Sequence, residues 1–278
     1  MQHFDKKSPF GRFFSIIKML GDLNKKQEYK TMKDYKVLAL DETGKASFGH
    51  LSKNFVLSGF ILPEKLKPKL NKSIRKLKKK YFNDEEIVFH CRDMLRKKGP
   101  FASLRVDPSK ELKFWSDFIV ILNAKFLSVA FVIADKNKAK KIGWNDIAIL
   151  RRSYSKILEE FTKKHLSKNN GKIVAESDPH QDKYLIEAHT RLQSMGIPSE
   201  GITGSDYRNK ITSLSLVNKL NLDVDVQMAD NLAIMADMVY KIKIGIKKKP
   251  TRVEAIMKRF IDRKMIDKDN PGIFEILV

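Results

Sequence analysis

The sequence has little cysteine: one residue, Cys91, among 278. A disulfide within the chain is therefore excluded. Because few cysteines and histidines lie close together, a structural zinc site is not expected. Scarce cysteine is typical of proteins from reducing compartments, and we expect a cytoplasmic location.

Long apolar runs are also missing. The longest, at 118–134, is interrupted by a polar and a charged residue, whereas a membrane-spanning helix needs about 20 mostly apolar residues. The segment 10–20 follows basic residues as a signal peptide does, but Lys18 interrupts it and no small-residue cleavage site follows. We interpret 1–34 as an N-terminal extension with an amphipathic helix, and expect no membrane partner.

Acidic residues are few relative to basic ones. The chain has 33 Asp and Glu against 55 Lys and Arg, a formal net charge of +22. Hydrophobic residues make up 42% of it and include 17 Phe, which excludes a disordered protein. A globular protein this basic is expected to bind an anionic partner, most commonly nucleic acid and otherwise an anionic membrane surface. A lysine-rich surface that serves only solubility is the alternative.

The order of the expected elements predicts a mixed α/β fold. Apolar runs next to turn residues predict strands at 35–40, 55–62, 87–90, 127–134, 172–175 and 211–217. Helical spacing and capping residues predict helices at 65–80, 109–123, 146–166, 177–195, 227–244 and 251–263. The first two strands are close enough to pair as antiparallel neighbours. This order is typical of a mixed sheet flanked by helices.

We therefore expect a core domain at 35–244, in which 65–80 is an inserted basic helix. Residues 245–278 are expected to form a basic helical tail. No internal repeat or low-complexity linker divides the chain.

Three carboxylates interrupt apolar segments. Asp41 and Glu176 each directly follow an expected strand, and Asp230 lies in the apolar start of an expected helix. An unpaired buried carboxylate is costly, so on a strongly cationic protein such a cluster is best explained by a divalent metal. Mg²⁺ and Mn²⁺ take oxygen ligands, and two such ions stabilise the attacking and leaving oxygens of a phosphodiester displacement. Asp237 shares a helix face with Asp230 and is a candidate fourth ligand.

Each carboxylate also has an ordinary structural interpretation. Asp41 lies where turns often have an aspartate. Glu176 can cap the next helix, although Asp178 is better placed as its N-cap. Asp230 can pair with a neighbouring Lys or Arg. The metal-site prediction depends on their shared position at the ends of apolar elements.

The order of these motifs resembles a prokaryotic family catalogued as domain of unknown function 3800. The motifs are Ala39-Leu-Asp-Glu-Thr-Gly44, Phe55-Val-Leu-Ser-Gly-Phe60, Lys172-Ile-Val-Ala-Glu176 and Gln227-Met-Ala-Asp230-Asn-Leu. Members typically open with a strand ending in Asp-Glu-Ser and close with a helix bearing Gln-Leu-Ala-Asp-Leu. The resemblance covers residues 37–240. It implies a ribonuclease H-like fold, often found near mobile elements and in phage defence.

The resemblance implies that Asp41 bridges two metal ions, that Glu176 is the second ligand and that Asp230 completes the set. Thr43 stands where the family usually has Ser, and Met228 where it usually has Leu. Both departures are conservative.

Auxiliary residues are expected beside this set. Glu42 follows Asp41, and His180 lies in the loop after Glu176, either as a proton-transfer group or as an exposed first-turn histidine. The segment 89–93 is similar to the family's histidine-containing strand, but Val88 stands where an acidic residue often occurs. His90 is therefore either a packed strand residue or a contact to the scissile phosphate.

Basic helices are expected to follow a phosphate backbone, which gives salt-dependent and sequence-independent affinity. Each basic residue is otherwise a solvated or ion-paired surface group. The predicted contacts to nucleic acid are Lys72, Lys76, Lys79, Arg151, Arg208, Lys210 and Lys248.

The leading hypothesis is a Mg²⁺- or Mn²⁺-dependent nuclease that hydrolyses phosphodiester bonds of DNA or RNA. The alternative is a nucleic-acid-binding protein or partner-recruiting subunit of the same fold without turnover. A third hypothesis is a protein that binds membrane surfaces through its N-terminal segment. No aromatic-rich platform separates DNA, RNA and hybrid substrates. A homodimer and a partner protein both stay open.

Overall fold

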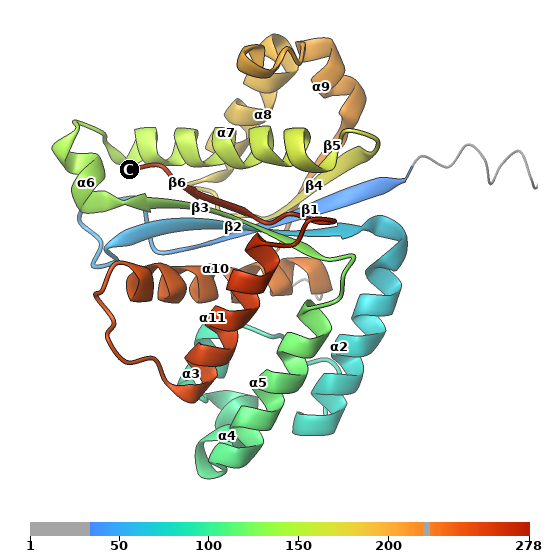
Figure 1. Ribbon diagram of the computed structural model, residues 1–278, viewed down its shortest axis with the longest axis vertical. Coiled ribbons are helices and arrows are strands. Elements are labelled where there is room, and N and C mark those ends of the chain that lie inside the picture. The colour runs from blue at the N-terminus through green and yellow to red at the C-terminus, as the bar shows by residue number, and fades with distance from the viewer. Residues whose placement is uncertain (1–33, 219–222) are drawn as a thin grey trace, which may run out of the picture. The chain divides into compact units, whose positions relative to one another are not determined.

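The computed structural model describes residues 34–218 and 223–278 (Figure 1). Tyr35–Val278 forms one unit by its internal contacts. The amphipathic helix expected within 1–34 lies outside the described residues.

Within the described residues, six strands form one mixed sheet in the spatial order β5-β4-β1-β2-β3-β6. β2 is antiparallel to its neighbours β1 and β3, whereas the pairs β1–β4, β4–β5 and β3–β6 are parallel. All strands except β2 therefore run in the same direction, and their carboxyl ends lie at the same end of the sheet. The strands are β1 (Tyr35–Thr43), β2 (Asn54–Pro63), β3 (Ser128–Asp135), β4 (Asn170–Glu176), β5 (Ile211–Val217) and β6 (Ile273–Ile276).

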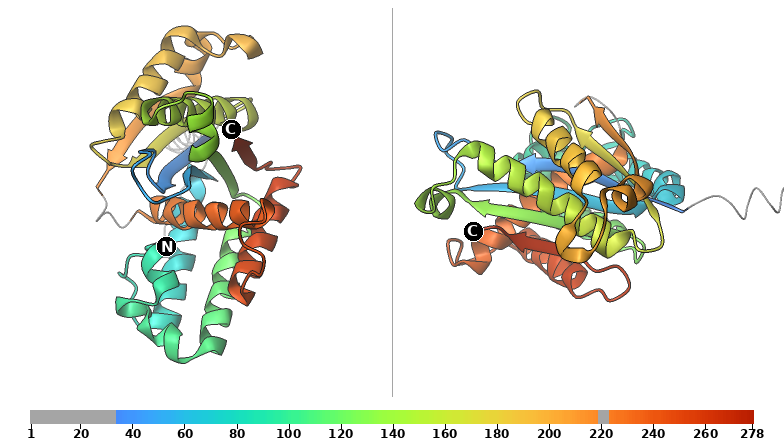
Figure 2. Two further views of the ribbon diagram at one scale, coloured as in Figure 1. Left: turned by 90° about the vertical axis from the view of Figure 1, so that its left-hand side faces the viewer. Right: turned by 90° about the horizontal axis from the view of Figure 1, so that it is seen from above.

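Helices cover both faces of the sheet (Figures 1 and 2). One face carries α2 (Lys67–Phe82), α3 (Cys91–Arg96), α4 (Ser103–Val106), α5 (Pro108–Leu122), α10 (Val224–Lys243) and α11 (Arg252–Met265). The other face carries α6 (Lys136–Lys141), α7 (Asp146–His165), α8 (Asp182–Met195) and α9 (Gly204–Lys210). Because both faces are covered, the central strands are apolar on both sides.

Side chains of β1 alternate between two cores. Val37 and Ala39 pack with residues of α10, whereas Leu38 and Leu40 pack against α7 and α8. This alternation follows from the two-residue period of a strand. It decides which way every later residue of β1 points.

The strands predicted at 35–40, 55–62, 127–134, 172–175 and 211–217 are confirmed, as is the antiparallel pairing of the first two. The strand predicted at 87–90 is wrong. There the Phe89 N–H donates to Gln227 Oε1 at 3.0 Å, and Asn231 Nδ2 donates to the Phe89 carbonyl at 3.0 Å. Side chains of α10 thus replace the strand partner that this segment would need.

The predicted start of α8 is also wrong. The helix begins at Asp182, not after Ser177. The residues before it form a turn in which the Gln181 N–H donates to the Asp178 carbonyl at 2.8 Å. The Ser177 hydroxyl and the Asp178 N–H both donate to the Asp182 carboxylate, at 2.6 and 2.9 Å. Asp178 therefore stabilises a turn and does not cap the helix.

Residues 245–278 contain the expected helix, α11, and also β6, a strand that the sequence did not predict. Met257, Phe260 and Ile261 of α11 are buried in the core formed with α10 and α5. β6 pairs in parallel with β3 at the edge of the sheet. This region packs onto the sheet as a continuation of the fold.

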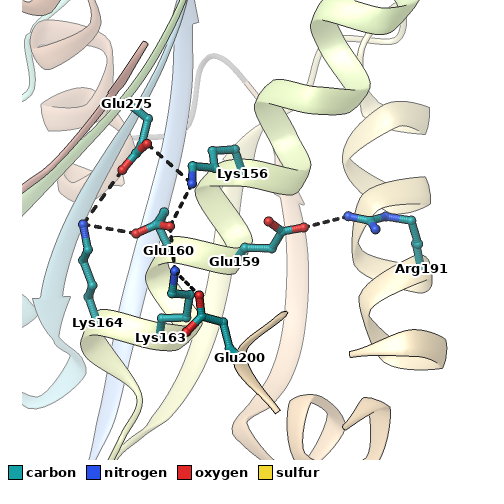
Figure 3. A network of polar contacts seen from close by, with 8 residues as sticks. All are labelled: Lys156, Glu159, Glu160, Lys163, Lys164, Arg191, Glu200 and Glu275. Atoms are coloured by element: carbon teal, nitrogen blue, oxygen red, sulfur yellow. Dashed lines mark hydrogen bonds and ion pairs between the residues drawn. The ribbon is translucent and has the colours of Figure 1, made fainter. Parts of the chain in front are cut away.

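A network of ion pairs connects α7 to β6 (Figure 3). The buried Glu160 carboxylate lies 3.0 Å from Lys156 Nζ and 3.1 Å from the Nζ atoms of Lys163 and Lys164. Lys156 and Lys164 also reach Glu275 of β6, at 3.5 and 4.0 Å. Glu160 therefore organises three lysines, two of which hold the last strand.

Candidate active site

Asp41 lies near the carboxyl end of β1, two residues before Thr43, and Glu176 is the last residue of the adjacent parallel strand β4. β1 and β4 pair as far as Leu40 and Ala175, and the two carboxylates are the next residue on each strand. Side chains two residues apart on a strand lie on the same face of the sheet. Asp41 therefore shares the face of Ala39, and Glu176 that of Val174, and both of these apolar residues pack in the core that includes α10. Both carboxylates therefore point to the face that α10 covers.

α10 brings Asp230 to this place. The helix packs against β1 and β2. The buried Ser58 hydroxyl, opposite Asp41 on β2, donates to the Ala229 carbonyl at 2.6 Å and lies 3.2 Å from the Asp41 carbonyl. One hydroxyl thus ties the residue before Asp230 to the strand pair that carries Asp41.

These side chains share one cavity of about 770 Å³. Its acidic lining residues are Asp41, Glu42, Glu176, Asp178, Asp230 and Asp237, and its basic ones are Lys45, His50, Lys53, His90, Arg92 and Lys241. Carboxylates and cations therefore line the same cavity in equal number.

The carboxylates crowd one another. Asp41 is 8% exposed. Burial raises the pKa of Asp41 well above its usual range, and the charges of Glu42, Asp230 and Glu176 raise it further. A hydrogen bond of 2.7 Å from the Glu42 N–H to Asp41 Oδ1 opposes this rise in pKa. Mutual repulsion of this kind is what a bound cation would relieve.

Several of these carboxylates are held by protein donors. Asp230 Oδ2 accepts the Cys91 N–H at 2.7 Å, and Glu42 Oε1 accepts Gln181 Nε2 at 2.7 Å. Such donors fix the orientation of a ligand side chain.

Asp237, the candidate fourth ligand, has protein partners at both oxygens. Asn54 Nδ2 donates to Oδ1 at 2.8 Å, and Lys241 forms an ion pair with Oδ2. Its carboxylate orients two other side chains of the cavity.

The residues fit a hard divalent ion by donor type, because they offer carboxylate oxygens, and by position, because they converge at one strand edge. As the side chains lie, no group of three His, Cys, Asp or Glu in the described part of the chain forms a metal site.

The basic residues predicted on α2 lie elsewhere. Lys72, Lys76 and Lys79 are exposed, but none lines the cavity. α2 follows the carboxyl end of β2. There Pro63 pairs with Lys36, near the start of β1, so α2 begins at the opposite end of the strands from Asp41. Charge density along a helix therefore did not locate the cavity.

The other predicted nucleic-acid contacts have separate surroundings. Arg151 pairs with Glu187 at 2.8 Å and lines a second cavity of about 730 Å³ beside α7. Arg208 donates to the Gln193 carbonyl and Lys210 to that of Leu166. These contacts connect α9 to neighbouring segments.

Lys248 is exposed between α10 and α11, and His180 is exposed beyond β4; neither lines the first cavity. His90 does line it, with Nδ1 3.0 Å from Asp93 Oδ2.

Five cationic residues of the cavity were not predicted as site residues: Lys45, His50, Lys53, Arg92 and Lys241. Lys45, His50 and Lys53 lie in the loop that directly follows β1, so their proximity to Asp41 along the chain is a usable signal. Arg92 and Lys241 arrive from distant segments and carry no such signal.

No family model matches this chain, and no curated protein and no solved structure is significantly similar to it. The family resemblance of its motifs therefore stays a prediction. In the described part of the chain, no helix has the length and apolar character to cross a membrane.

Proposed function

We propose that the protein is a divalent-metal-dependent nuclease of ribonuclease H-like fold that hydrolyses DNA or RNA. Asp41, Glu176 and Asp230 are its metal-binding carboxylates, and Mg²⁺ or Mn²⁺ is its ion. One observation carries the proposal: three carboxylates far apart in the chain line one cavity, two of them at or near the carboxyl ends of adjacent strands and one on α10.

The sheet supports this fold. Strands β1 to β5 have the spatial order β3-β2-β1-β4-β5. β2 is antiparallel to both of its neighbours, and β4 and β5 are parallel to β1. This is the arrangement expected of a ribonuclease H-like sheet, and β6 extends it beyond β3. The cavity lies at the carboxyl ends of parallel strands, where open α/β sheets bind their ligands.

The chain's own residues have distinct tasks in this proposal. Exposed Lys45, Lys53 and Arg92 attract a phosphate backbone to the cavity. Asp237 orients Lys241, whose ammonium offsets negative charge on the phosphate. Two bound divalent metal ions would supply an activated water and stabilise the leaving oxygen.

The second candidate is a nucleic-acid-binding protein of the same fold without turnover. It is favoured by the protein donors that already hold two of these carboxylates, the Cys91 N–H at Asp230 and the Gln181 amide at Glu42. In that case the carboxylates are structural, and the cationic residues around them still bind a polyanion.

The test measures cleavage and metal binding in the same variants. We expect the wild type to degrade nucleic acid with Mn²⁺ and to take up Mn²⁺ in calorimetry. Asp41→Asn and Asp230→Asn should abolish cleavage and keep nucleic-acid binding, because the cations that hold the backbone remain. Asp262→Asn on α11 is the control and should behave as wild type.

Cleavage that survives both Asp41→Asn and Asp230→Asn would reject the site. A wild type that takes up no Mn²⁺ but binds nucleic acid would favour the second candidate.

A further inference from the structure

A buried lysine holds the loop beside the candidate site. We call residues 44–53 the β1–β2 loop. Lys136, at the start of α6, is 4% exposed. Its Nζ donates to the carbonyls of Ser47, His50 and Lys45 at 2.7, 2.9 and 3.2 Å. An ammonium is costly to bury unless its donors are satisfied, and here the loop backbone satisfies all three.

Hydrogen bonds within the loop also hold its conformation. The Lys45 N–H donates to Ser52 Oγ at 3.1 Å, and the Ser52 N–H donates to His50 Nδ1 at 3.1 Å. The loop leaves β1 at Gly44, where φ is +76° and a Cβ would lie 2.2 Å from the Asn54 carbonyl oxygen. These contacts define one loop conformation before any partner binds, which lowers the entropy cost of binding.

This braced loop exposes an apolar tip between cations. Leu51 is 98% exposed, and Lys45, His50 and Lys53 beside it are exposed as well. All four line the cavity that contains Asp41. A single exposed leucine is ordinary on a protein surface. Here, however, a buried charge fixes the backbone that keeps the leucine in solvent.

We propose that the β1–β2 loop docks double-stranded nucleic acid. Lys45 and Lys53 contact phosphates of the backbone, and Leu51 inserts between neighbouring bases next to the phosphate that the carboxylates face. Apolar side chains are used as wedges of this kind by proteins that unstack and kink a duplex. The inference rests on the proposed function, which supplies the nucleic-acid partner.

The test is binding of a fluorescently labelled duplex by the full chain in EDTA, followed by anisotropy. Leu51→Ala should weaken binding about tenfold, which is about 1.4 kcal/mol. Val106→Ala is the control, because Val106 on α4 is 83% exposed and lies outside the cavity; its affinity should be unchanged. The fluorescence of a duplex that contains 2-aminopurine should increase when the wild type binds, because the base unstacks. It should not increase when Leu51→Ala binds.

Lys136→Met tests the brace separately. It should speed amide exchange at 45–52 and weaken duplex binding as Leu51→Ala does, since the wedge loses its support. If this variant does not fold, Leu51→Ala still decides the matter.

Equal duplex affinity of wild type and Leu51→Ala, with no 2-aminopurine signal, would overturn the inference even where cleavage depends on Asp41. Equal or tighter Leu51-dependent binding of a single strand would overturn the duplex assignment. Conversely, Leu51-dependent duplex binding without Asp41-dependent cleavage would leave the loop inference standing and remove the proposed nuclease.

Discussion

A substitution at Glu160 tests how much one buried ionic network contributes to the free energy of unfolding. Its side chain is 4% exposed and faces Lys156, Lys163 and Lys164 (Figure 3). Replacing it in Glu160→Gln keeps the volume and removes the charge that the three lysines share. We expect a clear loss of stability, because the three lysines lose their shared buried partner and keep only the more exposed carboxylates of Glu275 and Glu200.

The pKa of Glu160 sets the magnitude. Burial opposes ionisation, but hydrogen bonds from Lys156, Lys164 and Lys163 outweigh it and lower the pKa from 4.5 to about 2. A fall of this size corresponds to about 3 kcal/mol of folding free energy at neutral pH. The three lysine side chains are about a third exposed, and solvent screening reduces the expected effect to about 2 kcal/mol.

The sign of the pH dependence follows from the lowered pKa. The contribution of Glu160 is complete above pH 4.5 and is lost as the pH falls towards about 2. Urea denaturation followed by circular dichroism should therefore separate wild type from Glu160→Gln at pH 7, and the gap should close in acid.

Glu159→Gln is the matched control, since Glu159 makes one exposed pair with Arg191 at 2.8 Å. It should change the free energy of unfolding by less than about 1 kcal/mol. Equal effects of the two substitutions at pH 7, or a gap that persists unchanged in acid, would refute the reasoning.

Two further substitutions test the packing around the site. Gly59→Ala should lower the free energy of unfolding by about 1 to 3 kcal/mol, because the new Cβ would lie 2.6 Å from Leu38 Cδ1 and 3.1 Å from Ala130 Cβ; thermal denaturation measures the loss, and an unchanged melting temperature would contradict it. Gln227→Ala should cost a similar amount, because the Phe89 N–H and Lys78 Nζ both lose their acceptor, Gln227 Oε1. Faster amide exchange at Phe89 should accompany it, and unaltered exchange would show that Gln227 does not hold this segment.

Much of the sheet was predictable because its strands are buried on both faces and so form continuous apolar runs. The segment 87–90 looked like another such run. Its backbone partners are Gln227 and Asn231, which are more than a hundred residues away and leave no trace in local sequence. β6 was missed because it has only four residues and follows polar turns.

The candidate carboxylates were accessible to sequence reasoning because Asp41, Glu176 and Asp230 each interrupt an apolar element. Of the cations that line the same cavity, only those in the loop after β1 have such a signal, their proximity to Asp41 along the chain. Local charge density favoured α2, whereas the fold brings Arg92 of α3 and Lys241 of α10 to the cavity from distant parts of the chain. Position along the chain therefore indicates a lysine of the cavity only where it lies next to Asp41, as Lys45 and Lys53 do.

The order in which the ribosome delivers these residues has a consequence of its own. Asp41 is synthesised early on the first strand, whereas Asp230 arrives only with α10, after the sheet's central strands have been made. A nascent or truncated chain that stops before α10 therefore carries most of the basic surface without the complete carboxylate set. It also lacks the buried face of α10 that packs against β1 and β2, so the carboxylate set and this side of the core are completed by the same helix.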